Sequence, residues 1–506
     1  MTTLDAEKPA PVVSLRTGVL LGAVSLLLPA AVAAGLRLAV LPLGSREWAW
    51  GVRTPPRPWT LPTTFALLGV ILLALLVFEW VRAPRCPTRR TCAGLLAALL
   101  PLSLLIVGGI VLTDPIYPVT APVIVLSDIA TGYYGAAASL GPCDILGGQL
   151  TRARDTSQPD RVRTHPPGPI LFMWTVRELA LTNMDGLARL EVFLQHHFRV
   201  SPAELIGIAR FATKRHLTST DVLLASLIAW LLTLLPVLIY LPAYGLGTAL
   251  ADRRVGLAAA ALALCMPALW CFLPGIDGVG ALLALTALWL WAAALRGGSW
   301  WRYALAGLGF ALALFWSFGY LALGPVALFL AGRSRESRPA NLAAGLVFTL
   351  AAFALVYGAL DAACGYNLLT SMAASLAAQR LIMVREQRAY LTWLGLNPYA
   401  FLLFVGPALW PGLVVSWVSR AVQSGFVARL TQGTLLTLAG LILLGSTRGE
   451  VERIWVFLIP LLTLPLAVVL TRLPRHLALW LPALLLALQI AFAVFLANSF
   501  MLVTAT

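Results

Sequence analysis

Charged side chains are scarce in this chain of 506 residues: only 11% are Asp, Glu, Lys or Arg, whereas 60% are hydrophobic. An ordinary soluble chain carries about 25% charged residues. So few charges cannot cover a soluble surface, and the composition therefore excludes a water-soluble globule. Lysine is almost absent, because Lys8 and Lys214 are the only two, so the formal net charge of +15 comes almost entirely from arginine.

Motifs for metals, redox chemistry and nucleotides are also missing. The six cysteines form no CxxC pair, and no histidines accompany them at zinc-ligand spacing. The chain has neither a P-loop nor a glycine-rich dinucleotide fingerprint. The arginines lie in short clusters between apolar runs, not along one soluble face, which argues against a nucleic-acid partner. The sequence therefore predicts no nucleotide site and requires no cofactor.

Long apolar runs are what the chain has instead. A helix needs about 20 mostly apolar residues to cross a hydrocarbon core of about 30 Å. The pair of runs at 303–332 is interrupted by Gly319 and Gly324, so it could form one broken hairpin. We expect an all-α integral membrane protein with about 13 spans, the first of them an uncleaved N-terminal span. The spans are expected at 17–41, 62–82, 91–113, 221–247, 255–272, 279–296, 303–317, 319–332, 341–361, 398–418, 430–446, 454–471 and 477–502.

Arginine clusters in alternate short loops set the expected orientation, because such loops stay on the cytoplasmic side. The alternation predicts a cytoplasmic N-terminus and an outward C-terminus in a bacterial inner membrane. One loop opposes this orientation, because Arg37, Arg46, Arg53 and Arg57 would lie outside. We keep the orientation because five clusters support it. These five are Arg82 to Arg90, Arg253–Arg254, Arg296 with Arg302, Arg333 to Arg338, and Arg472 with Arg475.

One segment, 114–220, is long and polar enough to fold outside the membrane. It carries apolar residues at helical spacing, such as Leu187, Leu190 and Leu194, beside Arg189, which is typical of amphipathic helices on a membrane surface. We expect one membrane domain, 1–506, with 114–220 inserted as an extracytoplasmic loop. Cys143 and Cys364 both face outward in this topology, which permits a disulfide without requiring one.

Acidic residues near the exit of the third expected span are candidates for a general base. Asp114 lies in a Thr-Asp-Pro turn, and Asp128 precedes Tyr133 and Tyr134. A carboxylate at a membrane boundary can take a proton from a hydroxyl that it reaches. Each could equally be a helix cap or turn residue.

His165, in His-Pro-Pro before a short apolar run, could hold a phosphate or substrate, or form a structural hydrogen bond.

The order of these features resembles the GT-C glycosyltransferases, in the branch with protein O-mannosyltransferases, aminoarabinose transferases and bacterial family 39-type enzymes. The resemblance covers roughly residues 90–330: an outward acid, tyrosines, a His-Pro-Pro turn, and Asp252-Arg253-Arg254-Val255-Gly256 between spans. It implies a GT-C-type bundle and a polyprenyl-phosphate sugar donor. It also implies Asp128 as the base, with Asp114 as the reserve. Many relatives have two adjacent acids, whereas Ile129 follows Asp128, so a divalent metal is left open.

Further outward residues are candidates for substrate or carrier-phosphate binding. Asp277, in Pro-Gly-Ile-Asp-Gly, could line the site or cap a helix. Positive charge in outer loops opposes the positive-inside tendency and calls for a partner, which a carrier phosphate or anionic lipid headgroups could supply. Glu450 and Glu452 could neutralise arginines or bind sugar hydroxyls. The candidate binding residues are His165, Asp277, Arg385, Arg388, Tyr390, Glu450 and Arg453.

These features favour an inverting glycosyltransferase that moves a sugar from a polyprenyl-phosphate donor to a lipid, glycan or protein acceptor at the outer face. Asp128 would take the acceptor proton, and polyprenyl phosphate would leave against Arg388 or Arg453. One alternative is a lipid or solute transporter, although the expected spans hold few acids or paired charges and no evident inverted repeat. A second alternative is a GT-C-like protein that binds glycolipid without catalysis.

Overall fold

The computed structural model describes residues 13–45, 49–54, 56–83, 86–332, 339–419, 422–423 and 425–501. The part of the chain that it describes is almost entirely helical, and its only strands are two of two residues each. Four of the arginines that set the expected orientation, Arg85, Arg333, Arg335 and Arg338, lie outside the described residues, as does Arg46 of the loop that opposes it.

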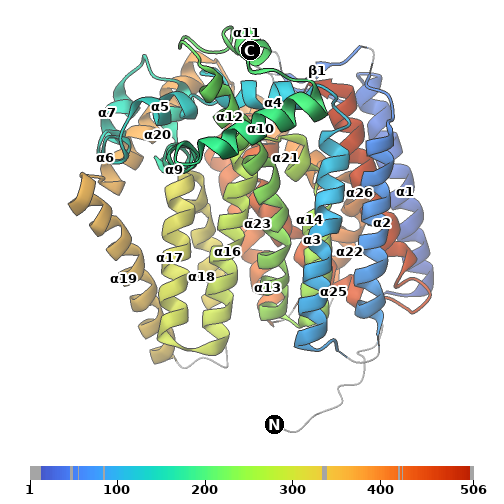
Figure 1. Cartoon of the computed structure of the whole chain (residues 1–506). Coiled ribbons are helices and arrows are strands. Elements are labelled where there is room, and N and C mark those ends of the chain that lie inside the picture. The colour runs from blue at the N-terminus through green and yellow to red at the C-terminus, as the bar shows by residue number, and fades with distance from the viewer. Residues whose placement is uncertain are drawn as a thin grey trace.

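Long helices run side by side through the body of the molecule (Figure 1). Nine helices of the described chain are long and apolar enough to cross a membrane. A 22-residue helix such as α2 is about 33 Å long, which matches the hydrocarbon core. The chain is therefore a polytopic, all-α membrane protein. The nine are α1 (Leu15–Arg37), α2 (Leu61–Arg82), α3 (Arg89–Val111), α12 (Ser219–Leu234) continued by η1 (Leu235–Ile239) and α13 (Tyr240–Leu250), α14 (Arg253–Leu264) with α15 (Pro267–Cys271), α16 (Ile276–Gly297), α19 (Pro339–Cys364), α23 (Gly425–Leu444) and α26 (Trp480–Ser499).

Four other expected spans are shorter or bent. α21 (Tyr390–Val405) and the piece made of η3 (Pro407–Leu409) and α22 (Trp410–Val418) meet at 83°, so they form either one broken span or a re-entrant pair. The other three are α17 (Trp300–Trp316), η2 (Phe318–Ala322) with α18 (Leu323–Ala331), and η4 (Val456–Leu458) with α25 (Ile459–Thr471). The number of spans therefore stays a prediction.

Burial separates the centre of the bundle from its lipid-facing rim. Every residue of α25 is buried, and 89% of the most apolar window of α14 and α15 is buried. The corresponding value for α19 is only 17%. A helix that is apolar all round and covered by protein belongs to the core, whereas exposed leucines on an outer helix suit contact with lipid.

The segment 114–220 gathers at one end of the bundle (Figure 1). It forms eight short helices: α4 (Tyr117–Leu126), α5 (Tyr133–Ser139), α6 (Pro142–Gly147), α7 (Gln149–Arg154), α8 (Asp160–Thr164), α9 (Gly168–Leu181), α10 (Met184–Phe198) and α11 (Pro202–Ala209). The strands β1 (Gly51–Val52) and β2 (Phe500–Met501) pair antiparallel at the same end. Which side of the membrane this end faces stays a prediction.

The stretch that carries Arg380 and Arg385 differs from expectation. We expected a loop between the spans at 341–361 and 398–418, but residues Leu368–Arg385 form a helix, α20, that packs against α7 and α8. Asn367 begins this helix by accepting a hydrogen bond from the backbone N–H of Thr370 at 3.1 Å. α20 therefore joins the helices of segment 114–220 in enclosing the space at this end of the bundle.

Candidate active site

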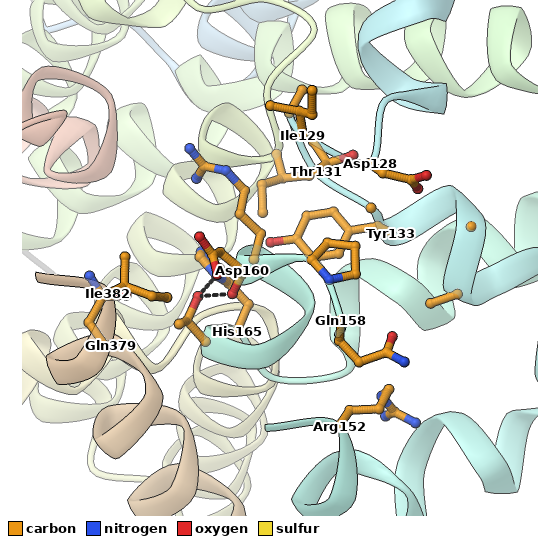
Figure 2. A pocket seen from close by; sticks show the side chains of 18 of the residues that line it. Asp128, Ile129, Thr131, Tyr133, Arg152, Gln158, Asp160, His165, Gln379 and Ile382 are labelled. Atoms are coloured by element: carbon orange, nitrogen blue, oxygen red, sulfur yellow. Dashed lines mark hydrogen bonds between the residues drawn. The ribbon is translucent and has the colours of Figure 1, made fainter. Parts of the chain in front are cut away.

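A cavity of about 1530 Å³ lies among these elements. Its walls come from the turn 128–132 and α5, from α6, α7 and α8, and from the turn 272–277 before α16. The far wall is made by α20 and by residues 450–454, which include α24 (Val451–Ile454). Segments separated by more than 300 residues therefore meet around one space, part of which Figure 2 shows.

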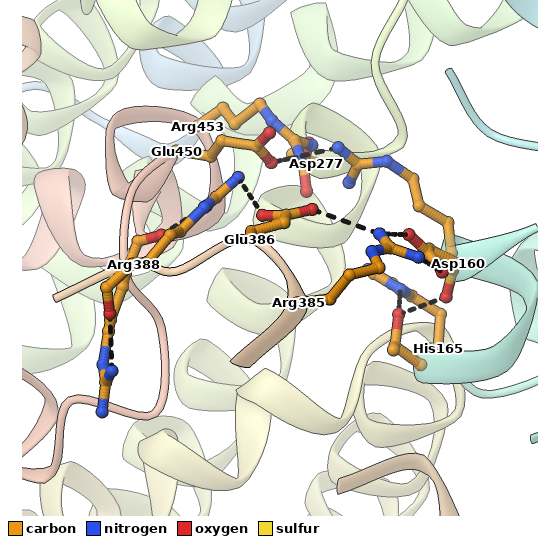
Figure 3. A network of polar contacts seen from close by, with 11 residues as sticks. Asp160, His165, Asp277, Arg385, Glu386, Arg388, Glu450 and Arg453 are labelled. Atoms are coloured by element: carbon orange, nitrogen blue, oxygen red, sulfur yellow. Dashed lines mark hydrogen bonds and ion pairs between the residues drawn. The ribbon is translucent and has the colours of Figure 1, made fainter. Parts of the chain in front are cut away.

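An ion-paired chain of four side chains, which we call the charged chain, crosses one wall of the cavity (Figure 3). Nη1 of Arg453 lies 2.7 Å from Oδ2 of Asp277, and each side chain is 15% exposed. The other terminal nitrogen of Arg453 donates to Glu450 Oε2, which also accepts from Nη2 of Arg161 at 3.0 Å. The charged chain Asp277–Arg453–Glu450–Arg161 thus joins α16, α24 and α8.

Mutual pairing outweighs the effect of burial on Glu450 and Arg453. Burial disfavours the carboxylate of Glu450, but Arg453 and Arg161 outweigh it, so the pKa of Glu450 lies below its ordinary value. Burial likewise disfavours the Arg453 guanidinium, yet Glu450 and Asp277 hold its pKa above the ordinary value. The formal charges of the two acids and two arginines in the charged chain sum to zero.

The backbone before α24 is held in place by a buried asparagine of α21. Asn397 donates from Nδ2 to the carbonyl of Thr447 at 2.7 Å and accepts from the N–H of Gly449 at 3.0 Å. Glu450 follows with φ of +59°, a left-handed conformation that is costly for a residue other than glycine. This fixed turn directs Glu450 and Arg453 into the charged chain.

A second ion-paired group lies at the end of α20. Nη2 of Arg385 lies 2.5 Å from Oδ2 of Asp160 on α8, although the Arg385 side chain is 60% exposed. Nη2 of Arg388 lies 2.6 Å from Oε2 of Glu386, and Nη1 donates to the carbonyl of Arg448. Figure 3 shows Glu386 between the two arginines. These two cations therefore both line the cavity.

His165 lies where α8 ends and its ring is uncharged. Its Nδ1 lies 3.1 Å from the Thr164 hydroxyl, and its carbonyl accepts a 2.8 Å hydrogen bond from the Gln149 amide. Burial, followed by the Arg161 guanidinium, lowers the pKa of His165 to about 4. A neutral imidazole can accept or donate a hydrogen bond but brings no positive charge to a phosphate.

The His-Pro-Pro-Gly turn owes its glycine to close packing. A Cβ atom on Gly168 would lie 2.2 Å from the carbonyl oxygen of Phe315 on α17, which is closer than atoms can approach. Gly168 therefore lets α9 start directly against the end of α17. Since His165 stands three residues before this contact, the contact fixes where the histidine enters the cavity wall.

Asp128 lines the cavity but is held by the segment after α11. Its Oδ2 accepts from the Thr213 hydroxyl at 2.8 Å and from the backbone N–H of Lys214 at 3.2 Å. These contacts orient the carboxylate and leave it half-buried. The position of Asp128 is therefore compatible both with a structural turn residue and with a general base.

Glu452 is a fully buried acid at the same wall. Its side chain lines the cavity and is 1% exposed. Burial, and then repulsion from Glu450, raises the pKa of Glu452 to about 7, while the indole of Trp50 acts in the opposite direction. This carboxyl group is thus close to half protonated near neutral pH.

A disulfide joins two cavity-lining cysteines. Cys143 of α6 and Cys364 at the end of α19 are bonded, with 4.8 Å between their Cα atoms, across 221 residues of sequence. The sequence permitted this bond without requiring it. Disulfides persist in oxidising compartments, which agrees with an outward-facing end of the bundle.

Seven of the nine residues chosen from the sequence line this one cavity: Asp128, His165, Asp277, Arg385, Arg388, Glu450 and Arg453. The other two do not. Asp114 forms an ion pair with Arg57 at 2.7 Å outside the lining, and Tyr390 donates its hydroxyl to the carbonyl of Leu443 at 2.7 Å. Both have partners within the protein, and their roles as base and substrate contact stay predictions.

Sequence reasoning missed Tyr133 as a site residue in its own right, together with Asp160, Arg161 and Glu386. Asp160 and Arg161 sit in a polar run with Arg152, Arg154 and Arg163, where nothing in the sequence distinguishes one arginine from the next. Arg161 lies four residues before His165, on the helix α8 that leads into it. The position of Arg161 near the His-Pro-Pro turn was the one sequence signal that could have identified it as a site residue.

Neither a metal centre nor a known relative adds to this description. Among the residues that the structure describes, no group of three or more His, Cys, Asp or Glu is placed to hold a metal ion. No protein-family model matches the chain, and no curated protein matches its sequence. The geometry of the cavity therefore carries the functional argument.

Proposed function

We propose that this protein is a glycosyltransferase that moves a sugar from a polyprenyl-phosphate donor to an acceptor hydroxyl, with inversion at the anomeric carbon. The observation that carries the proposal is the convergence of an acid, Asp128, and two arginine-bearing segments around one cavity at the end of a helical bundle. An acid facing a cation across a substrate-sized space suits transfer from an anionic leaving group.

The contacts indicate which residue would carry out each step of this reaction. Asp128 takes the proton of the acceptor hydroxyl, and the acceptor oxygen attacks the anomeric carbon while the bond from that carbon to the phosphate oxygen breaks. The bonding electrons leave with polyprenyl phosphate. Arg385 and Arg388 stabilise the departing phosphate, since guanidinium groups grip phosphate oxygens. Arg453 is a weaker choice for this role because its ion pairs are largely buried at 15% exposure, whereas the Arg385 side chain, also ion-paired, is 60% exposed and can exchange its partner at little cost.

A lipid-linked donor fits the position of the cavity. Its lining includes apolar side chains, among them Ile124, Leu140, Ile382 and Met383, next to its charged groups. A carrier with its tail in the membrane can present a headgroup at the end of the spans, whereas a soluble donor would need a nucleotide site that the sequence lacks. We place this end on the extracytoplasmic side of a bacterial plasma membrane, with the N-terminus in the cytoplasm.

The test uses the full-length protein in liposomes with a panel of polyprenyl-phosphate hexoses and pentoses. The proposal expects release of bare polyprenyl phosphate and a product of inverted anomeric configuration, detected by mass spectrometry and NMR. A parallel assay with a chelator asks whether a divalent metal is needed. Flux of lipid or solute across the bilayer without sugar transfer would favour a transporter, and donor binding without turnover would favour a glycolipid-binding protein.

A further inference from the structure

One tyrosine hydroxyl is buried at the cavity wall without a protein partner. Tyr133 begins α5, lines the cavity and is 0% exposed. Within the described ranges of the chain, no atom hydrogen-bonds its hydroxyl. Leaving a buried hydroxyl unsatisfied costs about 1–3 kcal/mol, so such a group in a folded protein calls for an explanation.

The position of Tyr133 is fixed by its neighbours. Its ring packs edge-on against the imidazole of His165, with 6.0 Å between the ring centroids. Figure 2 shows the hydroxyl directed toward the side of the cavity where Asp160 and His165 lie. Burial, more than the opposing effect of Arg161, holds the pKa of Tyr133 above its ordinary value. The hydroxyl therefore keeps its proton and remains a donor.

The groups around this hydroxyl carry no net charge. Arg161, Asp277 and Arg453 are the charged residues that act on Tyr133, and they belong to the charged chain, which is neutral as a whole. His165 is also uncharged at neutral pH, because its pKa is about 4. A phosphate placed here would face the carboxylates of Asp277 and Glu450, and the two arginines of the charged chain are already bonded to those carboxylates.

A sugar suits these surroundings better than a phosphate does. Sugar hydroxyls both donate and accept hydrogen bonds, so carboxylate acceptors, guanidinium donors and a neutral phenol can all serve them without a net charge. The second ion-paired group also sums to zero, but the Arg385 side chain is 60% exposed, so Arg385 can exchange Asp160 for a phosphate at little cost.

We infer that the Tyr133 hydroxyl hydrogen-bonds a hydroxyl of the transferred sugar and so helps to determine which sugar the protein accepts. This inference rests on the proposed function, because it assumes that a lipid-phosphate sugar enters the cavity. A site that hydrogen-bonds a substrate hydroxyl discriminates against analogues that lack it, since its own buried group is then left unpaired.

The adjacent residue supplies a matched control. Tyr134 is also buried in α5, but its hydroxyl donates to Oδ1 of Asp221 at 2.8 Å, and Tyr134 is not among the cavity-lining residues. Replacing either tyrosine by phenylalanine removes one hydroxyl from the same short helix. Only the Tyr133 change removes it from the cavity.

The experiment compares the affinity of full-length protein in nanodiscs for two probes. One is a C20 prenyl phosphate, and the other is the same lipid carrying the monosaccharide that the wild type binds best from a panel of hexoses and pentoses. Tyr133→Phe is expected to weaken binding of the glycosylated lipid about tenfold, which corresponds to one hydrogen bond, and to leave binding of the bare phosphate unchanged. Tyr134→Phe is expected to leave the ratio of the two affinities at its wild-type value.

The remaining outcomes separate this inference from the proposed function. Equal weakening of both probes by Tyr133→Phe, or no weakening of either, overturns the sugar contact while donor binding stands. A wild type that binds neither probe rejects the proposed function and the inference with it. Should Tyr133→Phe fail to fold, monodeoxy donors are tested on the wild type. Loss of one sugar hydroxyl is then expected to weaken binding about tenfold, and equal affinity for every deoxy donor overturns the contact.

Discussion

Arg453 and Asp277 are 176 residues apart in sequence, yet Nη1 of Arg453 lies 2.7 Å from Oδ2 of Asp277. Both side chains are only 15% exposed, so this ion pair is shielded from most of the solvent. It ties the first turn of α16 to α24 and completes the charged chain of the cavity wall. The pair therefore fixes the relative position of two segments that the sequence leaves unrelated.

Removing one charge of this pair should destabilise the fold. We expect Asp277→Asn to lower the free energy of unfolding by about 1–3 kcal/mol, because Arg453 then keeps Glu450 as its single carboxylate partner. Chemical denaturation in detergent measures the effect. A double-mutant cycle with Arg453→Gln should give a coupling energy well above zero, and additive effects would show that the ion pair adds nothing.

The buried acid Glu452 should make stability depend on pH. Its pKa is raised from 4.5 to about 7 in the fold, so the folded state binds more protons than the unfolded state between these values. Glu452 therefore makes its full contribution to the free energy of unfolding below about pH 4.5. This contribution, at most about 3 kcal/mol, is lost as the pH rises through 7.

A neutral isostere checks this account of Glu452. We expect Glu452→Gln to melt at a higher temperature than the wild type at pH 8, and the difference to shrink as the pH is lowered to 5. Thermal unfolding across this range measures both. A variant whose melting temperature runs parallel to that of the wild type at every pH would show that Glu452 is not the titrating group.

The cysteines should divide into a bonded pair and four thiols. Protein denatured without reductant should take up four alkyl groups, on Cys86, Cys92, Cys265 and Cys271, and protein reduced first should take up six. Intact-mass spectrometry counts them. Cys143→Ser should lower stability by about 2–5 kcal/mol, the usual effect of losing a native disulfide. Six alkyl groups without reductant would contradict the bond.

The close approach at Gly168 should tolerate no side chain. We expect Gly168→Ala to destabilise the protein by more than 1 kcal/mol, because its Cβ would overlap the Phe315 carbonyl and move backbone rather than a flexible side chain. Gly207→Ala in α11 is the control, since a Cβ there meets nothing within 4 Å and alanine favours helix. Equal melting temperatures for the two variants would refute the packing argument.

The spans were predictable where hydropathy is continuous and less so where it is not. α2 and α3 begin and end within about two residues of the expected runs, because unbroken leucine and valine runs give a strong signal. The 83° bend between α21 and α22 was missed. It occurs at Gly406, whose φ of +100° suits glycine and whose missing side chain makes room for Gln489.

The helix α20 was missed for a different reason. Its sequence from Leu368 is rich in alanine and serine and is interrupted by Gln379 and Arg380, so it shows neither a long apolar run nor a strong amphipathic pattern. Such a helix is stabilised by packing against α7 and α8, which a single sequence does not reveal. The arginines at its end were recognised as unusual, but their helix was not.

The site residues were recognisable by type but not by pairing. Outward acids and arginines stand out in an apolar chain, and this signal found Asp277, Arg388 and Glu450. The pairing of Asp160 with Arg385 depends on how α8 and α20 pack, which no spacing along the sequence encodes. The same limit hides the ion pair between Asp114 and Arg57, because Arg57 comes from a separate loop.

The most direct test of the central claim is the rate at which full-length protein in liposomes releases polyprenyl phosphate, measured for the wild type and for Asp128→Asn. Asparagine keeps an acceptor for Thr213 and Lys214 but removes the basic carboxylate. The account predicts at least about a hundredfold slower release with donor affinity unchanged, because general-base catalysis contributes about 10²- to 10⁴-fold. Release at the wild-type rate by Asp128→Asn would contradict it.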